Sequence, residues 1–181
     1  LHNKDIRGRV LEVKDPSYTR RFGGSEVTRS DVIDMIETNP MATIIADLTD
    51  RTGFPSAVFD CVILTQTLHM IYDIRAAIHS VHRALRPGGV LLLTVPGITK
   101  VDSGCPWFWS FTTLSARRVV EESFPPDLVE VQSHGNKLAA SGFLEGLAAS
   151  EFLSEELDAR DMEFPVCITV RAVKPEEGAA E

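Results

Sequence analysis

The sequence predicts an α/β fold built on a mostly parallel sheet that helices cover on both faces. Apolar runs of strand length alternate along the chain with segments of helical spacing, and residues 59–97 hold one complete unit of this kind. There, an apolar run at residues 59–64 leads into a helical pattern, and a turn at residues 86–89 leads into a second apolar run at residues 90–95. A strand, a crossover helix and a second strand form a right-handed unit with parallel strands.

Composition limits the classes of protein to which the chain can belong. Its 181 residues, 44% of them hydrophobic, suffice for one domain with a real core, which we place at residues 1–174 before a disordered acidic tail at 175–181. A net charge of -8 without clustered Lys and Arg argues against a nucleic-acid partner. No apolar run approaches the roughly 18 residues of a membrane span, and no signal-peptide core is present. We therefore expect a cytoplasmic protein without a membrane span.

The three cysteines, Cys61, Cys105 and Cys167, are widely spaced and odd in number. Neither a disulfide framework nor a CxxC metal site is indicated, so we expect no bound metal. Cys61 and Cys167 fall in apolar runs and are predicted core residues, whereas Cys105 lies in a loop.

The first predicted strands each carry an acidic residue at or near the end. Residues 9–13 form a short buried strand that a proline turn ends. Residues 27–32 form a weaker strand with Asp31 at its end, and Asp47 directly follows a strand at residues 42–46. Because parallel sheets bind ligands at the carboxyl ends of their strands, these acidic residues are candidate site residues.

The fourth strand, at residues 59–64, is followed by polar residues and then by a helix. The polar residues are Thr65, Gln66 and Thr67, which lie where a ligand is expected. Apolar residues then recur at helical spacing over residues 71–85, and the Pro-Gly-Gly sequence at residues 87–89 ends this helix.

The last third of the chain supplies an aromatic loop and four further elements. The loop covers residues 107–112. The elements are a helix at 114–124, a strand at 128–131, an alanine-rich helical segment at 138–157 and a final strand at 164–173.

This order of elements resembles the class I S-adenosylmethionine-dependent methyltransferases. The matching segments are Val10-Leu11-Glu12-Val13, Asp31, Asp47-Leu48, residues 59–64 and residues 85–91. The resemblance covers most of the chain, and its most specific part is residues 60–89. It implies a Rossmann-like, mostly parallel seven-stranded sheet with helices on both faces and an antiparallel last strand, and S-adenosylmethionine as cofactor.

The chain departs from this family after the first strand. Family members have a glycine-rich turn there, which lets the backbone approach the cofactor. Here residues 14–18 replace it, and the first glycines, Gly23 and Gly24, come later. Either a variant loop with Tyr18 and Thr19 shapes the wall of the cofactor site, or cofactor binding has been lost.

The resemblance assigns cofactor contacts to residues at the strand ends. Glu12 would accept a hydrogen bond from the methionine ammonium, Asp31 would bind the ribose diol, and Asp47 with the Leu48 amide would bind adenine. The remaining expected cofactor-binding residues are Tyr18, Thr65 and Gln66. The alternative for Glu12 and Asp31 is a solvated carboxylate at a strand end.

Catalytic and acceptor-binding residues are expected beside the same sheet edge. His69 follows the fourth strand, and an unperturbed imidazole pKa of roughly 6.5 suits a general base. Asp73 is an alternative base, although either residue could instead cap or pack against the helix that begins there. Trp107 and Trp109 could stack on a sugar or another ring, or could be core residues under a lid.

These observations predict S-adenosylmethionine-dependent O-methylation of a small-molecule acceptor, such as a sugar or glycan precursor. Residues 18–24 resemble bacterial methyltransferases of glycan pathways. The alternative is a catalytically inactive methyltransferase-like binding or scaffold module. A dinucleotide-dependent oxidoreductase is disfavoured because no GxGxxG follows the first strand. A homodimer, or a partner domain that supplies an N-terminal lid, could complete the acceptor pocket.

Overall fold

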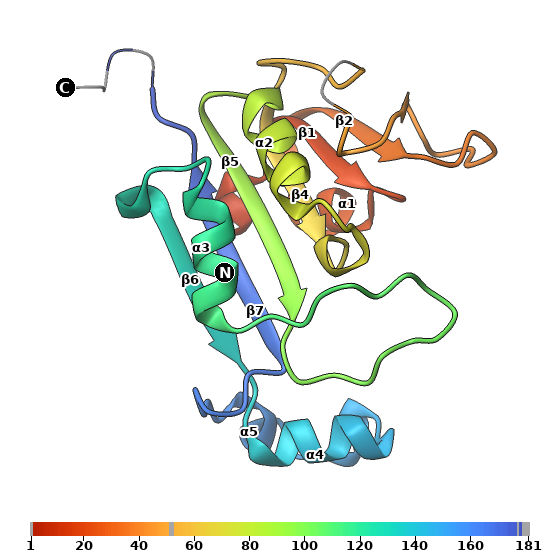
Figure 1. Cartoon of the computed structure of the whole chain (residues 1–181), viewed down its shortest axis with the longest axis vertical. Coiled ribbons are helices and arrows are strands. Elements are labelled where there is room, and N and C mark those ends of the chain that lie inside the picture. Colours follow the sequence, from red (N-terminus) through yellow and green to blue (C-terminus); the bar gives the residue numbers. More distant parts are fainter. Residues whose placement is uncertain (1, 51–52, 177, 179–181) are drawn as a thin grey trace.

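Seven strands form one sheet in the computed structural model, which describes residues 2–50, 53–176 and 178 (Figure 1). The strand order is β3-β2-β1-β4-β5-β7-β6. The strands are β1 (Gly8–Val13), β2 (Val27–Asp34), β3 (Ile44–Ile45), β4 (Phe59–Thr65), β5 (Leu85–Pro96), β6 (Val129–His134) and β7 (Cys167–Val173). The strands from β3 to β5 are parallel, whereas β7 pairs antiparallel with both β5 and β6. The predicted mostly parallel, seven-stranded sheet is confirmed.

Helices cover both faces of this sheet, as predicted. Side chains of α2 (Ile74–Ala84) and α3 (Thr113–Glu121) form the larger core with alternate strand residues such as Leu11. The opposite face has a smaller core around Val10, covered by the N-terminal segment and the short helix α1 (Ser17–Phe22). This unequal cover leaves part of the second face open.

Several element boundaries differ from those that the sequence predicts. Strand β2 extends to Asp34 because Val32 and Ile33 continue its buried run. The Pro-Gly-Gly sequence lies within β5, since α2 already ends at Ala84. Residues 138–157 form two short helices, α4 (Lys137–Glu145) and α5 (Ser154–Asp158), rather than one. Helix α3 and strands β3 and β7 are shorter than expected, and β6 runs on to residue 134.

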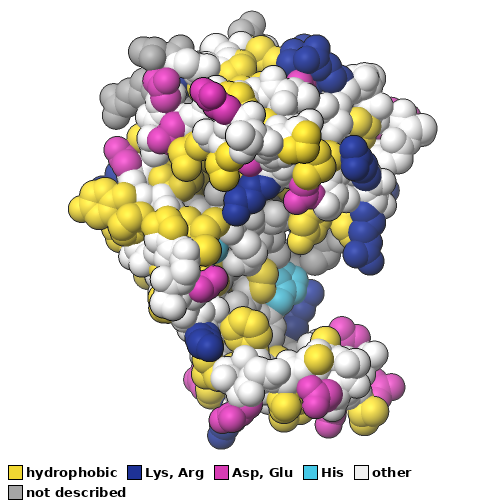
Figure 2. All heavy atoms as spheres, turned by 90° about the vertical axis from the view of Figure 1, so that its right-hand side faces the viewer, with side chains coloured by type: hydrophobic (Ala, Val, Ile, Leu, Met, Phe, Trp, Pro, Cys, Tyr) yellow, Lys and Arg dark blue, Asp and Glu magenta, His cyan; other side chains and the backbone are white. Residues whose placement is uncertain are grey.

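Helices α4 and α5 form a lobe beyond the carboxyl end of β6. Figure 2 shows this lobe set apart from the rest of the molecule, with a hollow between them. None of the described helices is both long and apolar enough to cross a membrane. Of the tail predicted at 175–181, residues 177 and 179–181 lie outside the described residues.

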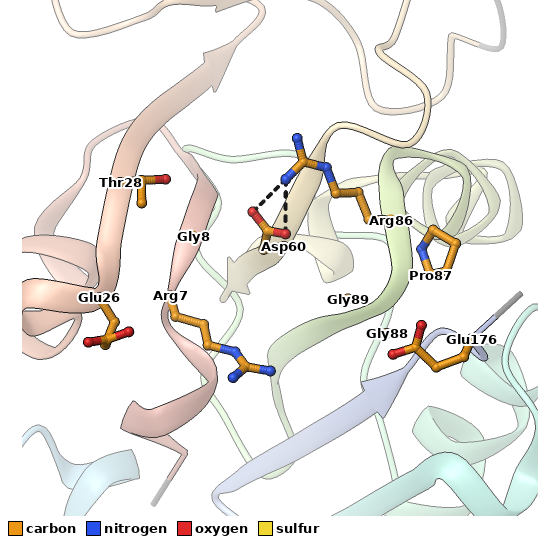
Figure 3. Close-up of a pocket in the computed structure, with 10 residues that line it drawn as sticks. All are labelled: Arg7, Gly8, Glu26, Thr28, Asp60, Arg86, Pro87, Gly88, Gly89 and Glu176. Carbon is orange, nitrogen blue, oxygen red and sulfur yellow. Dashed lines mark hydrogen bonds and ion pairs between the residues drawn. The ribbon is translucent and has the colours of Figure 1, made fainter.

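A polar hollow of about 480 Å³ lies at the amino ends of the parallel strands (Figure 3). In it, the Asp60 carboxylate accepts hydrogen bonds from the Arg9 amide at 2.7 Å and from Arg86 Nη1 at 2.9 and 3.0 Å. These contacts join β1, β4 and the start of β5. Residues 60–89 are the most specific part of the family resemblance. Two of them, Asp60 and Arg86, therefore hold the sheet together at the edge opposite to the expected ligand.

Gly8 is required where β1 passes Asp60. Its φ is +63°, and a Cβ atom there would lie 2.3 Å from Asp60 Oδ2. We expect Gly8→Ala to lower the free energy of unfolding by about 2 kcal/mol, because backbone strain adds to displacement of the carboxylate. Gly24→Ala is the matched control, since Gly24 also has positive φ (+61°) but its Cβ would meet nothing within 4 Å. Urea unfolding would contradict the account if both variants lost the same stability.

Candidate active site

A cavity of about 270 Å³ opens at the carboxyl ends of the strands, between the ends of β1, β2, β3 and β4. We call it the edge cavity; its lining includes Lys14, Asp34, Leu48, Thr67 and Ile71, with Cys105 and Pro106 from the loop after β5. Strand order reverses between β1 and β4, and open α/β sheets bind ligands at such a point. The edge cavity therefore lies where a ligand is expected.

Asp34 ends β2 and presents a fixed carboxylate to the edge cavity. Its Oδ2 accepts a hydrogen bond from Asn39 Nδ2 at 2.7 Å, and its Oδ1 accepts one from the Ile36 amide at 3.0 Å. Burial acts to raise the pKa of Asp34, but the hydrogen bonds from Asn39 and the backbone outweigh burial and lower it, helped by the charge of Lys14. The carboxylate is thus ionised at neutral pH and can accept hydrogen bonds from a ligand.

Lys14 follows β1 in a backbone conformation that favours glycine, with φ +68°. Its amide donates to the Ile33 carbonyl at 3.0 Å, and its carbonyl accepts from Asn39 Nδ2 at 2.8 Å. Of the described residues that line the edge cavity, Lys14 is the only one with a cationic side chain.

Asp31 does not lie at the end of its strand, contrary to the expectation from the sequence, and its contact with a ribose stays a prediction. It lies inside β2, is 1% exposed, and accepts hydrogen bonds from Arg9 Nε at 2.6 Å and Arg29 Nη2 at 3.0 Å. Arg29 Nε at 3.2 Å and the Thr43 hydroxyl at 3.0 Å donate further hydrogen bonds to it. Its carboxylate is the ion-pair partner of Arg9 and Arg29, and the carboxylate at the end of β2 is that of Asp34.

Glu12 is also turned inward, and its expected contact with a ligand ammonium stays a prediction. The side chain is 2% exposed and accepts hydrogen bonds from the Tyr18 amide, the Thr19 amide and the Thr19 hydroxyl at 2.8–2.9 Å. These contacts fix the first turn of α1 against the end of β1, in a loop that lacks the glycine-rich sequence.

Three residues expected near a ligand, Asp47, Leu48 and Thr67, do line the edge cavity. Asp47 and Leu48 follow β3 there, and Leu48 is 7% exposed. The Asp47 Oδ1 atom accepts hydrogen bonds from the Thr49 amide and hydroxyl at 2.8 and 2.9 Å, which fixes the turn after the strand. Their roles toward a ligand stay predictions.

A second cavity of about 270 Å³ lies on the thinly covered face of the sheet. We call it the face cavity; Tyr18 and Phe22 from α1 line it together with Thr65, Thr94 and Thr169. The three threonines are direct neighbours in register on β4, β5 and β7. They form a row of hydroxyl groups on an otherwise apolar surface.

The middle threonine of this row, Thr94, and the one at its β7 end, Thr169, are hydrogen-bonded to neighbouring side chains. Gln66, with φ +45°, directs its amide nitrogen Nε2 to Thr94 Oγ1 at 3.3 Å. His134 Nε2 lies 3.1 Å from Thr169 Oγ1. Burial, followed by the nearby charge of Arg160, lowers the pKa of His134. Its imidazole is therefore neutral at neutral pH and can accept a proton.

His69 is buried and lines neither the edge cavity nor the face cavity, and its expected role as a base stays a prediction. It is 4% exposed and lies against the Trp107 ring, with the ring centroids 4.2 Å apart. Burial lowers its pKa. The His69 carbonyl accepts hydrogen bonds from the Phe108 and Trp109 amides, at 3.0 and 3.3 Å. His69 and Trp107 therefore hold the loop after β5 against the segment after β4.

Asp73 and Trp109 lie at a third cavity, of about 400 Å³, between the starts of α2 and α3. Asp73 caps α2, since its Oδ1 accepts a hydrogen bond from the Ala76 amide at 3.0 Å. Trp109 Nε1 donates to the Ile71 carbonyl at 2.9 Å, and its ring lies beside Tyr72. Asp73 thus acts as a helix cap, one of the two roles that the sequence left open, and its role as a base stays a prediction.

The sequence reasoning missed four of the residues that define the two cavities: Lys14, Asp34, Thr94 and Thr169. Asp34 follows the apolar pair Val32-Ile33, so extending that strand by two residues would have identified it. Nothing in the local sequence shows that Thr94 and Thr169 are neighbours, because they are distant along the chain. In the described residues, no group of three or more His, Cys, Asp or Glu is arranged to hold a metal ion.

In a comparison with known protein families, one family model matches part of the chain. The model described as methyltransferase domain matches residues 18–93, which run from α1 into β5. No curated protein sequence matches the chain.

Solved structures share the fold at low sequence identity. An S-adenosylmethionine-dependent methyltransferase from Archaeoglobus fulgidus is 12% identical, with TM-score 0.62, covering 93% of this chain and 86% of that chain. A chain of a Haloferax volcanii complex with the Trm112 methyltransferase activator is 14% identical, with TM-score 0.60, covering 95% and 84%. Phosphoethanolamine N-methyltransferase 2 of Haemonchus contortus, complexed with S-adenosylhomocysteine, is 15% identical, with TM-score 0.61, covering 94% and 50%.

Proposed function

Since the chain has the class I methyltransferase fold and carries a methyltransferase domain over residues 18–93, we propose that it methylates a hydroxyl group of a small molecule. Its cofactor is S-adenosylmethionine, which supplies a methyl group on a positively charged sulfur that is a good leaving group. The observation that supports this proposal most is that two cavities lie at the end of β4. Thr67 lines the edge cavity, and Thr65 lines the face cavity.

The residues of the edge cavity fit the adenosine half of this cofactor. The Asp34 carboxylate would accept hydrogen bonds from the ribose diol, and the apolar side chains of Leu48 and Ile71 would contact the adenine ring. Asp47 would accept a hydrogen bond from the adenine amino group. A volume of about 270 Å³ lies near the lower end for small-molecule pockets, so the methionine half would extend beyond the cavity, past Lys14.

The face cavity fits a small acceptor with an apolar body and a hydroxyl group. Tyr18 and Phe22 offer aromatic surface, and the threonine row offers three hydroxyl groups. A ring such as a sugar could lie against the aromatic side chains while its hydroxyl group binds Thr169. Trp109 lies at the third cavity, beside α2 and α3, and Trp107 packs against His69, so we place the acceptor in the face cavity instead of at the two tryptophans.

We assign the removal of the acceptor proton to His134. The acceptor hydroxyl would donate its proton to Thr169 Oγ1, and the Thr169 hydroxyl would donate its own proton to His134 Nε2, 3.1 Å away. The neutral imidazole can take this proton because burial lowers the pKa of His134. Thr169 and His134 thus take the place of His69.

The experiment that tests this function is a methyl-transfer assay. The protein is incubated with S-adenosylmethionine labelled in its methyl group and with a panel of sugars, phenols and amines. Labelled product from a hydroxyl compound supports the proposal. Label transferred only to amines would contradict O-methylation. Binding of cofactor without product across the panel would favour the alternative of a binding or scaffold module.

With an active acceptor in hand, Thr169→Val is expected to lower kcat roughly 10-fold or more, because it interrupts proton transfer to His134. His134→Asn should lower kcat to a similar extent. The affinity for S-adenosylhomocysteine should stay within about twofold, since neither residue lines the edge cavity. His79→Asn, at an exposed position on α2, is the control. Full kcat in Thr169→Val would remove this relay from the mechanism.

We also propose that a second copy of the chain or a partner domain covers the face cavity. Tyr18 and Phe22 are 45% and 42% exposed at its rim, which is large for aromatic side chains. One protein of similar structure is found in a complex with a methyltransferase activator. Light scattering in the presence and absence of acceptor would reveal a dimer. A cytoplasmic location and a bacterial source stay predictions from the sequence.

A further inference from the structure

We propose that Lys14 binds the carboxylate of the methionine moiety of the cofactor, and so replaces the contacts that a glycine-rich turn would offer. This inference rests on the proposed function, because it requires S-adenosylmethionine in the edge cavity. The carboxylate is the one negatively charged group of that cofactor, and Lys14 would be the side chain that recognises it.

The backbone of Lys14 is the first observation. A residue with a side chain rarely adopts a φ of +68°, whereas glycine does so readily. The hydrogen bonds of its amide to Ile33 and of its carbonyl to Asn39 hold it in this conformation. Strained backbone of this kind is found preferentially at functional sites, so the lysine side chain is expected to have a role that glycine cannot supply.

The charges around the edge cavity are the second observation. Its described lining contains two carboxylates, of Asp34 and Asp47, and Lys14 as the one cation. Adenosine carries no negative charge, so the ammonium group of Lys14 has no counterpart in that half of the cofactor. The sulfur and the amino group are both positive and are repelled by a lysine. Only the carboxylate is attracted to it.

The position of Lys14 relative to Asp34 is the third observation. The Nδ2 atom of Asn39 donates to the Lys14 carbonyl at 2.8 Å and to Asp34 Oδ2 at 2.7 Å. The Asn39 side chain therefore links the backbone of Lys14 to the Asp34 carboxylate, which is assigned to the ribose. Asn39 thus holds the Lys14 backbone beside the carboxylate that would bind the ribose.

The test compares two ligands that differ in one group. Decarboxylated S-adenosylhomocysteine keeps the adenosine, the thioether and the amine, but lacks the carboxylate. We expect Lys14→Met to weaken calorimetric binding of S-adenosylhomocysteine roughly 10-fold and to change binding of the decarboxylated ligand by less than about twofold. Lys14→Arg, which keeps the charge, should bind S-adenosylhomocysteine within about threefold of the wild type.

Lys14→Gly gives a second readout. Glycine relieves the backbone strain, so Tm should rise by roughly 2–4 °C while S-adenosylhomocysteine binding weakens as in Lys14→Met. Equal losses for both ligands in Lys14→Met would show that Lys14 acts on the ribose through Asp34, and no loss for either would show that it binds nothing. Both results overturn this inference but leave the proposed function standing. Failure of the wild type to bind S-adenosylhomocysteine overturns both.

Discussion

Replacing Asp34 with asparagine is expected to weaken S-adenosylhomocysteine binding roughly 50-fold, which corresponds to a loss of about 2.3 kcal/mol. Asparagine keeps the shape of the side chain but removes the negative charge that would accept the ribose hydroxyl hydrogens. The Asn39 and Ile36 hydrogen bonds show that the carboxylate is already held in place before a ligand binds. Little entropy is therefore lost in ordering it, and most of its interaction energy contributes to affinity.

The control for Asp34→Asn is Glu37→Gln. Glu37 is exposed on the same loop and does not line the edge cavity, so its loss removes the same charge without removing a contact. Calorimetric titration should show wild-type affinity for Glu37→Gln. If the two variants lost affinity equally, the effect of Asp34 would be a long-range effect of charge, and the ribose assignment would be wrong.

Replacing Asp31 with asparagine is expected to lower the free energy of unfolding by about 3 kcal/mol, and Tm by roughly 6–12 °C. Asp31 is 1% exposed and has Arg9 and Arg29 as ion-pair partners. Asparagine leaves both guanidinium groups without a counter-charge. The loss is smaller than for a fully buried pair because 59% of the Arg29 side chain is exposed. Affinity for S-adenosylhomocysteine in the folded variant should stay near that of the wild type.

The stability that Asp31 provides should depend on pH in a defined direction. Burial acts to raise the pKa of Asp31, but hydrogen bonds from Arg9, Arg29 and Thr43 outweigh burial and lower it. A folded-state pKa below the unfolded value of roughly 3.9 means that the stabilisation is complete above that pH and is lost as the pH falls through the folded-state pKa.

Urea unfolding between pH 5 and pH 2 checks this dependence. The wild type should lose stability more steeply than Asp31→Asn as the pH falls below about 4. Asp127→Asn, at an exposed position, should follow the wild type and stay within about 0.5 kcal/mol of it. A parallel decline of Asp31→Asn and the wild type would show that the ion pairs do not stabilise the fold.

The sequence was sufficient to predict the sheet because burial leaves a strong local signal. Residues 61–64 and 90–93 are continuous apolar runs, as expected for strands that are covered on both faces. The antiparallel pairing of β7 followed from the resemblance rather than from its own pattern. The short strand β3 and the division of residues 138–157 into two helices carry weak local signals, and these elements were predicted least well.

The site was less predictable because its residues depend on boundaries and on long-range contacts. Asp31 and Asp34 are three residues apart, and only the true end of β2 decides which of them faces a ligand. His69 has the sequence position of a base, but packing against Trp107 buries it. The threonine row exists only because three strands align in register.

The structure of the protein crystallised with S-adenosylhomocysteine tests the central claim most directly. The account predicts the adenine ring against Leu48 and Ile71, the ribose hydroxyls on the Asp34 carboxylate and the amino-acid end beside Lys14. A ligand bound in the polar hollow around Asp60 and Arg86, at the opposite edge of the sheet, would contradict it. So would a ribose bound to any side chain other than Asp34.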